Sequence, residues 1–190
     1  MAKQQLRQTI RALLKTMSRE ERERQSSVVF RKLSSDSRFL AAKRVGLYVS
    51  KEREIDTEKI FEFCFDLNKR VFIPKFSINS REMDLVEVKD MDDFRSLKEM
   101  DFRVKQPSDV VGRAEALSSG GLDVIIVPGL GFTCSGLRLG NGFGFYDKYL
   151  NKCFDSECRP LVVGLAFTQQ ILNEIPVDSH DVKMDFVLFP

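Results

Sequence analysis

The stretch "LDVIIVPGLGFTCSGLRLGNGFGFYDKYL", Leu122–Leu150, decides the fold class and most of the functional interpretation. Its first residues form an apolar, largely β-branched run, which predicts a buried strand over Leu122–Pro128. Its last residues predict a helix that begins near Phe145. Between the two, the segment Gly136–Asp147 contains four glycines, one arginine and one aspartate. The question is what a loop with so much bare backbone does beside a cation and a carboxylate.

Further strands are predicted on both sides of this stretch. Short runs rich in β-branched and aromatic residues span Arg44–Ser50, Arg70–Pro74 and Pro160–Phe167, and a helical segment, Asp56–Lys69, separates the first two. Their near-continuous apolarity indicates burial on both faces, which is typical of a parallel α/β sheet. Three other segments are predicted as a more exposed strand, a helical turn and a long surface loop, namely Glu82–Asp90, Asp92–Leu97 and Met100–Gly121.

The beginning of the chain predicts three helices. The first has an apolar face and, beside it at the rim of the core, a basic stripe. The face consists of Leu6, Ile10, Leu13, Leu14 and Met17, and the stripe of Lys3, Arg7, Arg11 and Lys15. Ser18 and Glu21 have the spacing of a capping box, which starts a second helix that runs towards Leu33. A short third helix is expected within "DSRFLAAK".

Composition excludes several classes of protein. A chain of 190 residues with 43% apolar and 31% charged residues is expected to form one soluble domain, residues 1–190. No apolar run reaches the ~20 residues of a membrane span, and a net charge of +2 argues against a nucleic-acid partner. The start lacks the apolar core of a secretory signal, so a cytoplasmic protein is expected. The cysteines show no zinc-site spacing with each other or with His180, which predicts free thiols at Cys64, Cys134, Cys153 and Cys158.

The residues of the glycine-rich loop leave more than one interpretation open. A dinucleotide fingerprint fails because Cys134 stands where a third glycine is needed. A Walker A loop fails because Leu137 and Arg138 stand where its lysine and its serine or threonine belong. The glycines could simply permit positive φ angles before a helix. Alternatively, backbone amides and Arg138 could bind phosphate, with Asp147 as a ligand of Mg²⁺.

The chain resembles a known family at several separate motifs. "PGLGFTCSGLRLGNGFGFYD" matches the spaced pattern "PG…F…G.RLG.G.G.YD", and "KQQLR", "MSREER", "IPKF" and "IPVDSHDVKMDFVL" match elsewhere. The pattern is similar to that of the 5-formyltetrahydrofolate cyclo-ligases, also called 5,10-methenyltetrahydrofolate synthetases. The resemblance implies a three-layer α/β/α Rossmann-like fold with a mostly parallel sheet. It also implies an ATP- and Mg²⁺-dependent enzyme that converts 5-formyltetrahydrofolate to 5,10-methenyltetrahydrofolate, with release of ADP and phosphate, by phosphorylation of the formyl oxygen and ring closure by N10.

The resemblance also implies positions for the site. Arg138 and Tyr146 are the catalytic positions, and Asp147 and Asp181 are the metal ligands. The ATP-binding positions are Lys3, Gln4, Gln5, Leu6, Arg7, Arg138, Leu139, Gly140, Asn141, Gly142, Phe143, Gly144, Phe145 and Tyr146. The folate-binding positions are Arg7, Val49, Glu54, Asn141, Gly142, Phe143, Gly144 and Phe145.

Three positions depart from the family pattern. Phe143 stands where many relatives have lysine, Asn141 where some have arginine, and Phe145 where tyrosine is frequent. Two of these changes remove positive charge, which predicts weaker phosphate binding. Because Arg138 and the carboxylates are retained, we expect an active enzyme of small-molecule substrates. We also expect a monomer. The alternative is a noncatalytic or weakly active folate- or nucleotide-binding protein of the same fold.

Overall fold

A mostly parallel, six-stranded sheet forms the centre of the protein. The structure, a computed structural model, describes residues 2–77, 80, 82–155 and 159–190. Only the edge strand β3 runs antiparallel to its neighbour, β2. The predicted fold class is therefore confirmed. In spatial order, the strands are β11 (Phe186–Leu188), β9 (Leu161–Leu165), β6 (Val124–Val127), β1 (Arg44–Gly46), β2 (Arg70–Ser77) and β3 (Glu82–Val88).

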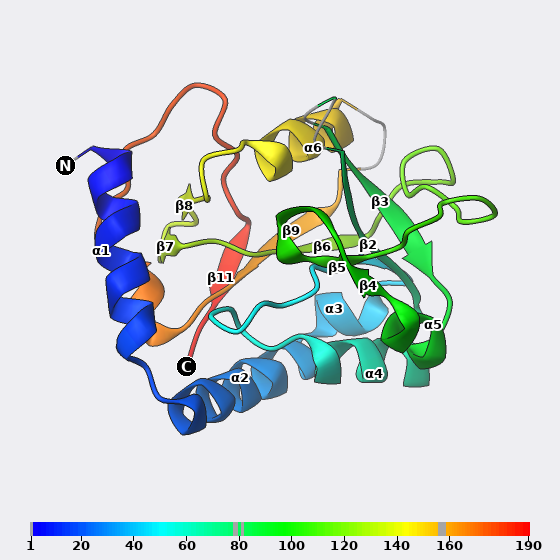
Figure 1. Cartoon of the computed structure of the whole chain (residues 1–190), viewed down its shortest axis with the longest axis horizontal. Helices are drawn as coiled ribbons and strands as arrows, with labels where there is room; N and C mark the ends of the chain where they lie inside the picture. The colour runs from blue at the N-terminus through cyan, green and yellow to red at the C-terminus, as the bar shows by residue number, and fades with distance from the viewer. Residues whose placement is uncertain (1, 78–79, 81, 156–158) are drawn as a thin grey trace.

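Helices cover both faces of this sheet (Figure 1). One face carries α2 (Arg19–Ser34), α3 (Ser37–Ala41), α4 (Glu58–Asp66) and α5 (Met91–Ser96), and the other carries α6 (Phe145–Phe154). Successive residues of β6 serve the two cores in turn: Val124 and Ile126 join the core under α2 and α4, and Ile125 and Val127 join the core under α6. This double burial is the physical reason for the continuous apolar run that predicted the strand.

Side-chain caps start several helices where the sequence indicates. The Ser18 hydroxyl accepts a hydrogen bond from the Glu21 N–H at the start of α2, and Asp36 caps α3. Helix α1 (Lys3–Thr16) buries Ile10 and Leu14 on its apolar face. The expectation that Leu13 belongs to that face is wrong, because its side chain is 41% exposed.

The interpretations of two other segments need correction. Strand β3 is less exposed than its rough alternation suggested, because α6 packs beside it, and Met83, Leu85, Val86 and Val88 are all buried. The segment Met100–Gly121 is not simply a surface loop. It contains the 3-10 turn η1 (Asp101–Arg103) and β5 (Lys105–Gln106), which pairs with β4 (Lys98–Glu99). The buried Gln106 side chain accepts a hydrogen bond from the Phe76 N–H and so ties this segment to β2.

A small second sheet shapes the remaining end of the molecule. Its strands are β10 (Ile171–Leu172), β7 (Gly131–Thr133) and β8 (Arg138–Leu139), next to the turn η2 (Thr168–Gln170). Helix α1 lies across this end, beside β7 and β8 (Figure 1).

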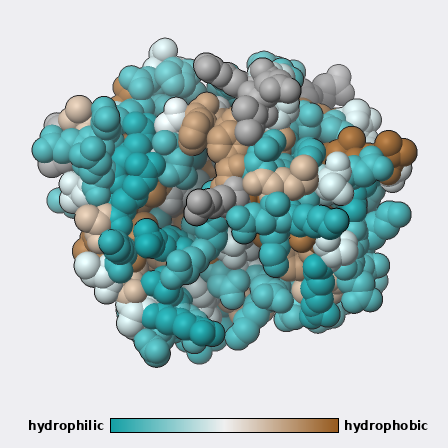
Figure 2. Space-filling view, in the orientation of Figure 1, coloured by the Kyte–Doolittle hydropathy of each residue, from teal (hydrophilic) through white to brown (hydrophobic). Residues whose placement is uncertain are grey.

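In the orientation of Figure 1, the surface of the protein is mostly hydrophilic with separate apolar patches (Figure 2). Among the described residues, no helix is long and apolar enough to cross a membrane. Cys64 and Cys153 are buried and Cys134 is exposed, while Cys158 lies outside the described residues.

Candidate active site

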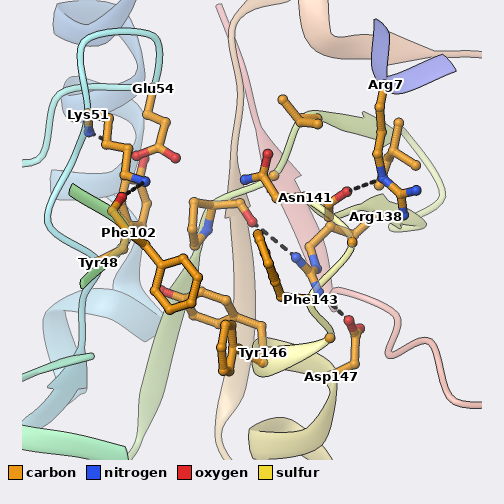
Figure 3. A pocket seen from close by; sticks show the side chains of 18 of the residues that line it. Arg7, Tyr48, Lys51, Glu54, Phe102, Arg138, Asn141, Phe143, Tyr146 and Asp147 are labelled. Atoms are coloured by element: carbon orange, nitrogen blue, oxygen red, sulfur yellow. Dashed lines mark hydrogen bonds and ion pairs between the residues drawn. The ribbon is translucent and has the colours of Figure 1, made fainter. Parts of the chain in front are cut away.

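A pocket of about 630 Å³ opens where the parallel strands β1 and β6 end. Its walls come from α1, from the segment after β1, from the chain between β6 and α6, and from the loop near residue 180 (Figure 3). Ligands of α/β proteins usually bind at this carboxyl edge of the sheet. The residues that line the pocket are Lys3, Arg7, Arg11, Leu14, Tyr48, Val49, Lys51, Arg53, Glu54, Pro74, Phe76, Phe102, Val104, Pro128, Gly129, Leu130, Arg138–Asp147, Asp178, His180 and Asp181.

A buried ion pair forms one wall of the pocket. The Arg138 Nη2 donates to Asp147 Oδ2 over 2.7 Å, and the two side chains are only 5% and 13% exposed. The other carboxylate oxygen, Asp147 Oδ1, accepts from the Val182 N–H at 3.1 Å. The Arg138 Nη1 donates to the Pro128 carbonyl, while its buried Nε has no hydrogen-bond partner among the described residues. A buried guanidinium with an unused N–H is suited to an additional anionic acceptor.

The glycines of the loop bring the backbone close to the first helix. Gly142 and Gly144 have φ angles of 107° and 73°, in a region that favours glycine. Gly140 does not have a positive φ angle. The Arg7 Nε donates to the Gly140 carbonyl over 2.8 Å. Gly144 also precedes α6, whose first-turn N–H groups receive no side-chain cap from it. Uncapped N–H groups at a helix start, next to arginines, form a favourable place for an anion.

A second cluster of charges joins α1 to the loop near residue 180. The Lys3 Nζ lies 2.6 Å from Asp178 Oδ2 and 2.5 Å from Asp181 Oδ2. Asp181 Oδ2 also accepts from the Asp178 N–H. Partial burial would raise the pKa of Asp181, but the Asp178 N–H and the Lys3 ammonium outweigh burial and hold that pKa below its ordinary value. With His180, these carboxylates offer ligand atoms that all lie within 4.8 Å of one another.

The opposite end of the pocket is less charged. Glu54 Oε2 accepts from the Lys51 N–H, and burial raises the pKa of the Glu54 carboxyl. The phenol of Tyr146 lies nearby, and its pKa is raised by burial first and by Glu54 second. Tyr146 is therefore a neutral hydrogen-bond donor near pH 7 rather than a base. The Tyr48 hydroxyl donates to the Ile55 carbonyl and so fixes the segment that carries Glu54.

Four phenylalanines from three segments line the same end. Ring centroids of Phe143 and Phe145 lie 5.8 Å apart in a stacked arrangement, and Phe102 meets both edge-on at 5.0 and 5.3 Å. Phe76 contacts Phe102 and Phe145 from β2. The Lys51 Nζ donates to the Phe102 carbonyl and links this cluster to the Glu54 segment. A planar aromatic ligand is the natural partner of such a wall.

Most residues implied by the sequence motifs come together in this pocket. Lys3, Arg7, Val49, Glu54, Asp181 and the whole run Arg138–Asp147 line it. The structure does not bring Gln4, Gln5 or Leu6 to its wall: the two glutamines are exposed, and Leu6 packs against the core. The sequence motifs did not predict four other residues that line the pocket, namely Lys51, Phe76, Phe102 and Asp178. Arg11 also lines the pocket, and its Nη2 donates to Asn141 Oδ1. It belonged to the predicted basic stripe but not to the predicted site.

Comparisons with known proteins agree with the motifs. A sequence model described as the 5-formyltetrahydrofolate cyclo-ligase family matches residues 1–190. The chain is 40% identical to a mouse (Mus musculus) protein named 5-formyltetrahydrofolate cyclo-ligase, over 99% of this chain and 93% of the mouse protein. A Caenorhabditis elegans protein named probable 5-formyltetrahydrofolate cyclo-ligase is 37% identical, over 98% of this chain and 92% of its own length.

A solved structure is similar over almost the whole chain. The Aquifex aeolicus 5,10-methenyltetrahydrofolate synthetase superposes with a TM-score of 0.80 at 29% identity, over 99% of this chain and 89% of that one. The resemblance inferred from the sequence is therefore confirmed. Because the family match spans the whole chain, and the relatives and the fold agree with it, the chain belongs to the 5-formyltetrahydrofolate cyclo-ligase family.

Proposed function

We propose that the protein converts 5-formyltetrahydrofolate to 5,10-methenyltetrahydrofolate with consumption of ATP in the presence of Mg²⁺. The observation that carries this proposal is one pocket with two different ends. One end has Lys3, Arg7 and Arg138 beside the start of α6, which Gly144 leaves without a side-chain cap, and the other has Glu54 beside a wall of phenylalanines. A polyanion and a planar, hydrogen-bonding ring would thus be held side by side, which is what transfer of a phosphoryl group between them requires.

The charged end would hold the triphosphate. Arg138 is buried and its Nε–H is unpaired within the described part of the chain, and Arg7 lies against the glycine loop. These groups would stabilise the negative charge that shifts onto the phosphate oxygens during transfer. Arginines held in place by the Gly140 carbonyl and by Asp147 would do so with little reorganisation at the moment of reaction.

Two carboxylates at this end fit Mg²⁺. Asp147 and Asp181 both line the pocket, and Asp147 binds the Val182 N–H directly after Asp181 in the chain. Magnesium prefers oxygen ligands and commonly takes one or two carboxylates together with phosphate oxygens. The ion would neutralise phosphate charge, while the two aspartates would hold it beside the loop.

The other end would hold and orient the folate. Glu54 would accept hydrogen bonds from the N–H groups of the pterin ring, and Phe145 would pack against it. In the reaction, the formyl oxygen attacks the γ-phosphorus and ADP leaves. N10 then attacks the activated formyl carbon, loses its proton, and phosphate departs as the ring closes. Tyr146, a neutral donor in the same pocket, would stabilise the oxygen that carries the transferred group.

A coupled assay tests the proposal. Purified protein is mixed with 5-formyltetrahydrofolate and MgATP, and the absorbance of the methenyl product is followed together with ADP release. We expect one ADP for each product molecule and no product when ATP is replaced by a non-hydrolysable analogue. Folate binding without turnover would overturn the proposal.

That negative outcome is the prediction of a second candidate, a noncatalytic or weakly active binding protein. The observation in its favour is that Phe143, 60% exposed at the pocket, brings no positive charge to it. The monomeric state and the cytoplasmic location stay predictions, and light scattering after gel filtration tests the first.

A further inference from the structure

The ammonium of Lys3 sits between two carboxylates of the pocket, in a place that a divalent cation would suit. Its Nζ contacts Asp178 Oδ2 and Asp181 Oδ2 at 2.6 and 2.5 Å, and the Lys3 side chain is only 18% exposed. A lysine side chain with two carboxylate partners carries its positive charge at neutral pH. One positive charge thus faces two negative charges.

The other carboxylate of the site has a different kind of partner. Asp147 is bound by the buried guanidinium of Arg138, which is fixed further by the Pro128 carbonyl. Lys3, in contrast, is held only by the two aspartates among the contacts of the described residues. It also stands on the first turn of α1, at the end of a flexible four-carbon side chain. Of the two cations, Lys3 is therefore the one that can leave its carboxylates.

We propose that Lys3 is an exchangeable counter-ion that couples metal binding to nucleotide binding, with Asp178 and Asp181 as the carboxylates that it releases. Without nucleotide, the ammonium occupies the carboxylates and competes with a divalent cation. When phosphates enter beside α1, they attract Lys3, the two carboxylates become free, and the metal ion takes its place. The inference rests on the proposed function, because it places a nucleotide in this pocket.

Thermodynamic linkage gives the inference a measurable form. If the nucleotide frees the metal site, the metal must increase nucleotide affinity by the same factor. In the wild type, the two ligands should bind with positive coupling. Removal of the ammonium should abolish the competition, so the variant should bind the metal well even without nucleotide and show little further gain when nucleotide is added.

The experiment measures Mn²⁺ binding by electron paramagnetic resonance, with and without saturating ADP. Lys3→Met is compared with Lys15→Met, which removes an exposed charge from the same helix. Without nucleotide, we expect Lys3→Met to bind Mn²⁺ about twofold to fivefold more tightly than the wild type, the range for one partly exposed ion pair. Lys15→Met should equal the wild type. ADP should tighten Mn²⁺ binding in the wild type and much less in Lys3→Met.

Two further variants show which groups are responsible. Lys3→Arg keeps the charge and should restore weak nucleotide-free binding, whereas Asp181→Asn added to Lys3→Met should remove the gain. Unchanged or undetectable Mn²⁺ binding in Lys3→Met without nucleotide would overturn the inference. If ADP has no effect on any variant while Lys3→Met still gains affinity, the competition stands and the proposed nucleotide site is wrong.

Discussion

Replacement of Asp147 by asparagine tests the buried ion pair and the metal site together. Both carboxylate oxygens of Asp147 are used: Oδ2 accepts from Arg138 at 2.7 Å and Oδ1 from the Val182 N–H at 3.1 Å. An asparagine amide has one acceptor and one donor, so it can satisfy only one of these partners. The other would face an N–H group, and the 95% buried guanidinium would lose its counter-charge.

The expected loss of stability follows from these contacts. Breaking a buried ion pair costs about 3 to 5 kcal/mol, and a charge-assisted hydrogen bond contributes about 1.5 to 3 kcal/mol. Because asparagine keeps one of the two bonds, we expect Asp147→Asn to lower the free energy of unfolding by about 2 to 3 kcal/mol. For a chain of this length, this corresponds to a drop in melting temperature of about 4 to 12 °C.

Urea unfolding followed by circular dichroism measures this loss, and the coupled assay at varied Mg²⁺ measures the effect on the metal. The matched control is Asp155→Asn, which changes an exposed carboxylate at the end of the same helix. At temperatures where Asp147→Asn is folded, its turnover should need a higher Mg²⁺ concentration. A variant as stable as the wild type would refute the ion-pair reasoning, and an unchanged Mg²⁺ dependence would remove Asp147 from the metal site.

Three other substitutions give independent tests. Glu54→Gln should raise the KM for folate and yet stabilise the fold at pH 7. Burial raises the pKa of Glu54 in the folded protein, so ionisation of this carboxyl lowers stability as pH rises through that pKa. The stability gained by Glu54→Gln should therefore vanish below the ordinary pKa of glutamate. Phe143→Lys should lower the KM for ATP about tenfold by adding a cation at the pocket, whereas Phe143→Met should not. Gly136→Ala should cost about 3 kcal/mol or more in urea unfolding, because its φ is 93° and a Cβ would lie 2.3 Å from the Met184 carbonyl oxygen. Gly112→Ala, with φ of 75° and open space, should cost only about 1 kcal/mol, and equal losses would contradict the clash.

Local signals predicted much of the fold. Apolar runs located the parallel strands β1, β2, β6 and β9 because most of their residues are buried, whereas the short, half-buried strand β11 was not predicted. Ser18 marked a helix start because its hydroxyl satisfies a backbone N–H group. The failures have equally local reasons. Two-residue pairing between β4 and β5 leaves no periodic pattern, and Gln106 is a polar residue that is buried because it bonds the Phe76 N–H. The exposure of Leu13 depends on where α1 rests, which helical spacing alone does not specify.

The candidate site was predictable where a motif is continuous in sequence and not where it is assembled in space. The run from Arg138 to Asp147 is continuous from β8 to the first turn of α6, so its residue types already allowed phosphate and metal binding as one interpretation. The contacts of Lys3 with Asp178 and Asp181 join residues that are 175 and 178 positions apart, and no spacing rule reports them. Phe102 came to the pocket through a segment that was expected to be a surface loop.

The wide separation of Lys3 and Asp181 has a consequence for synthesis of the protein. The two residues are made 178 positions apart, and they share one wall of the pocket. During translation at about 5 to 20 residues per second, α1 would wait on the order of ten seconds or more before its partners leave the ribosome. In that interval, the apolar side of α1, with Ile10 and Leu14, has no finished core to cover. The nascent chain should therefore acquire ligand affinity last, long after its first helix has been made.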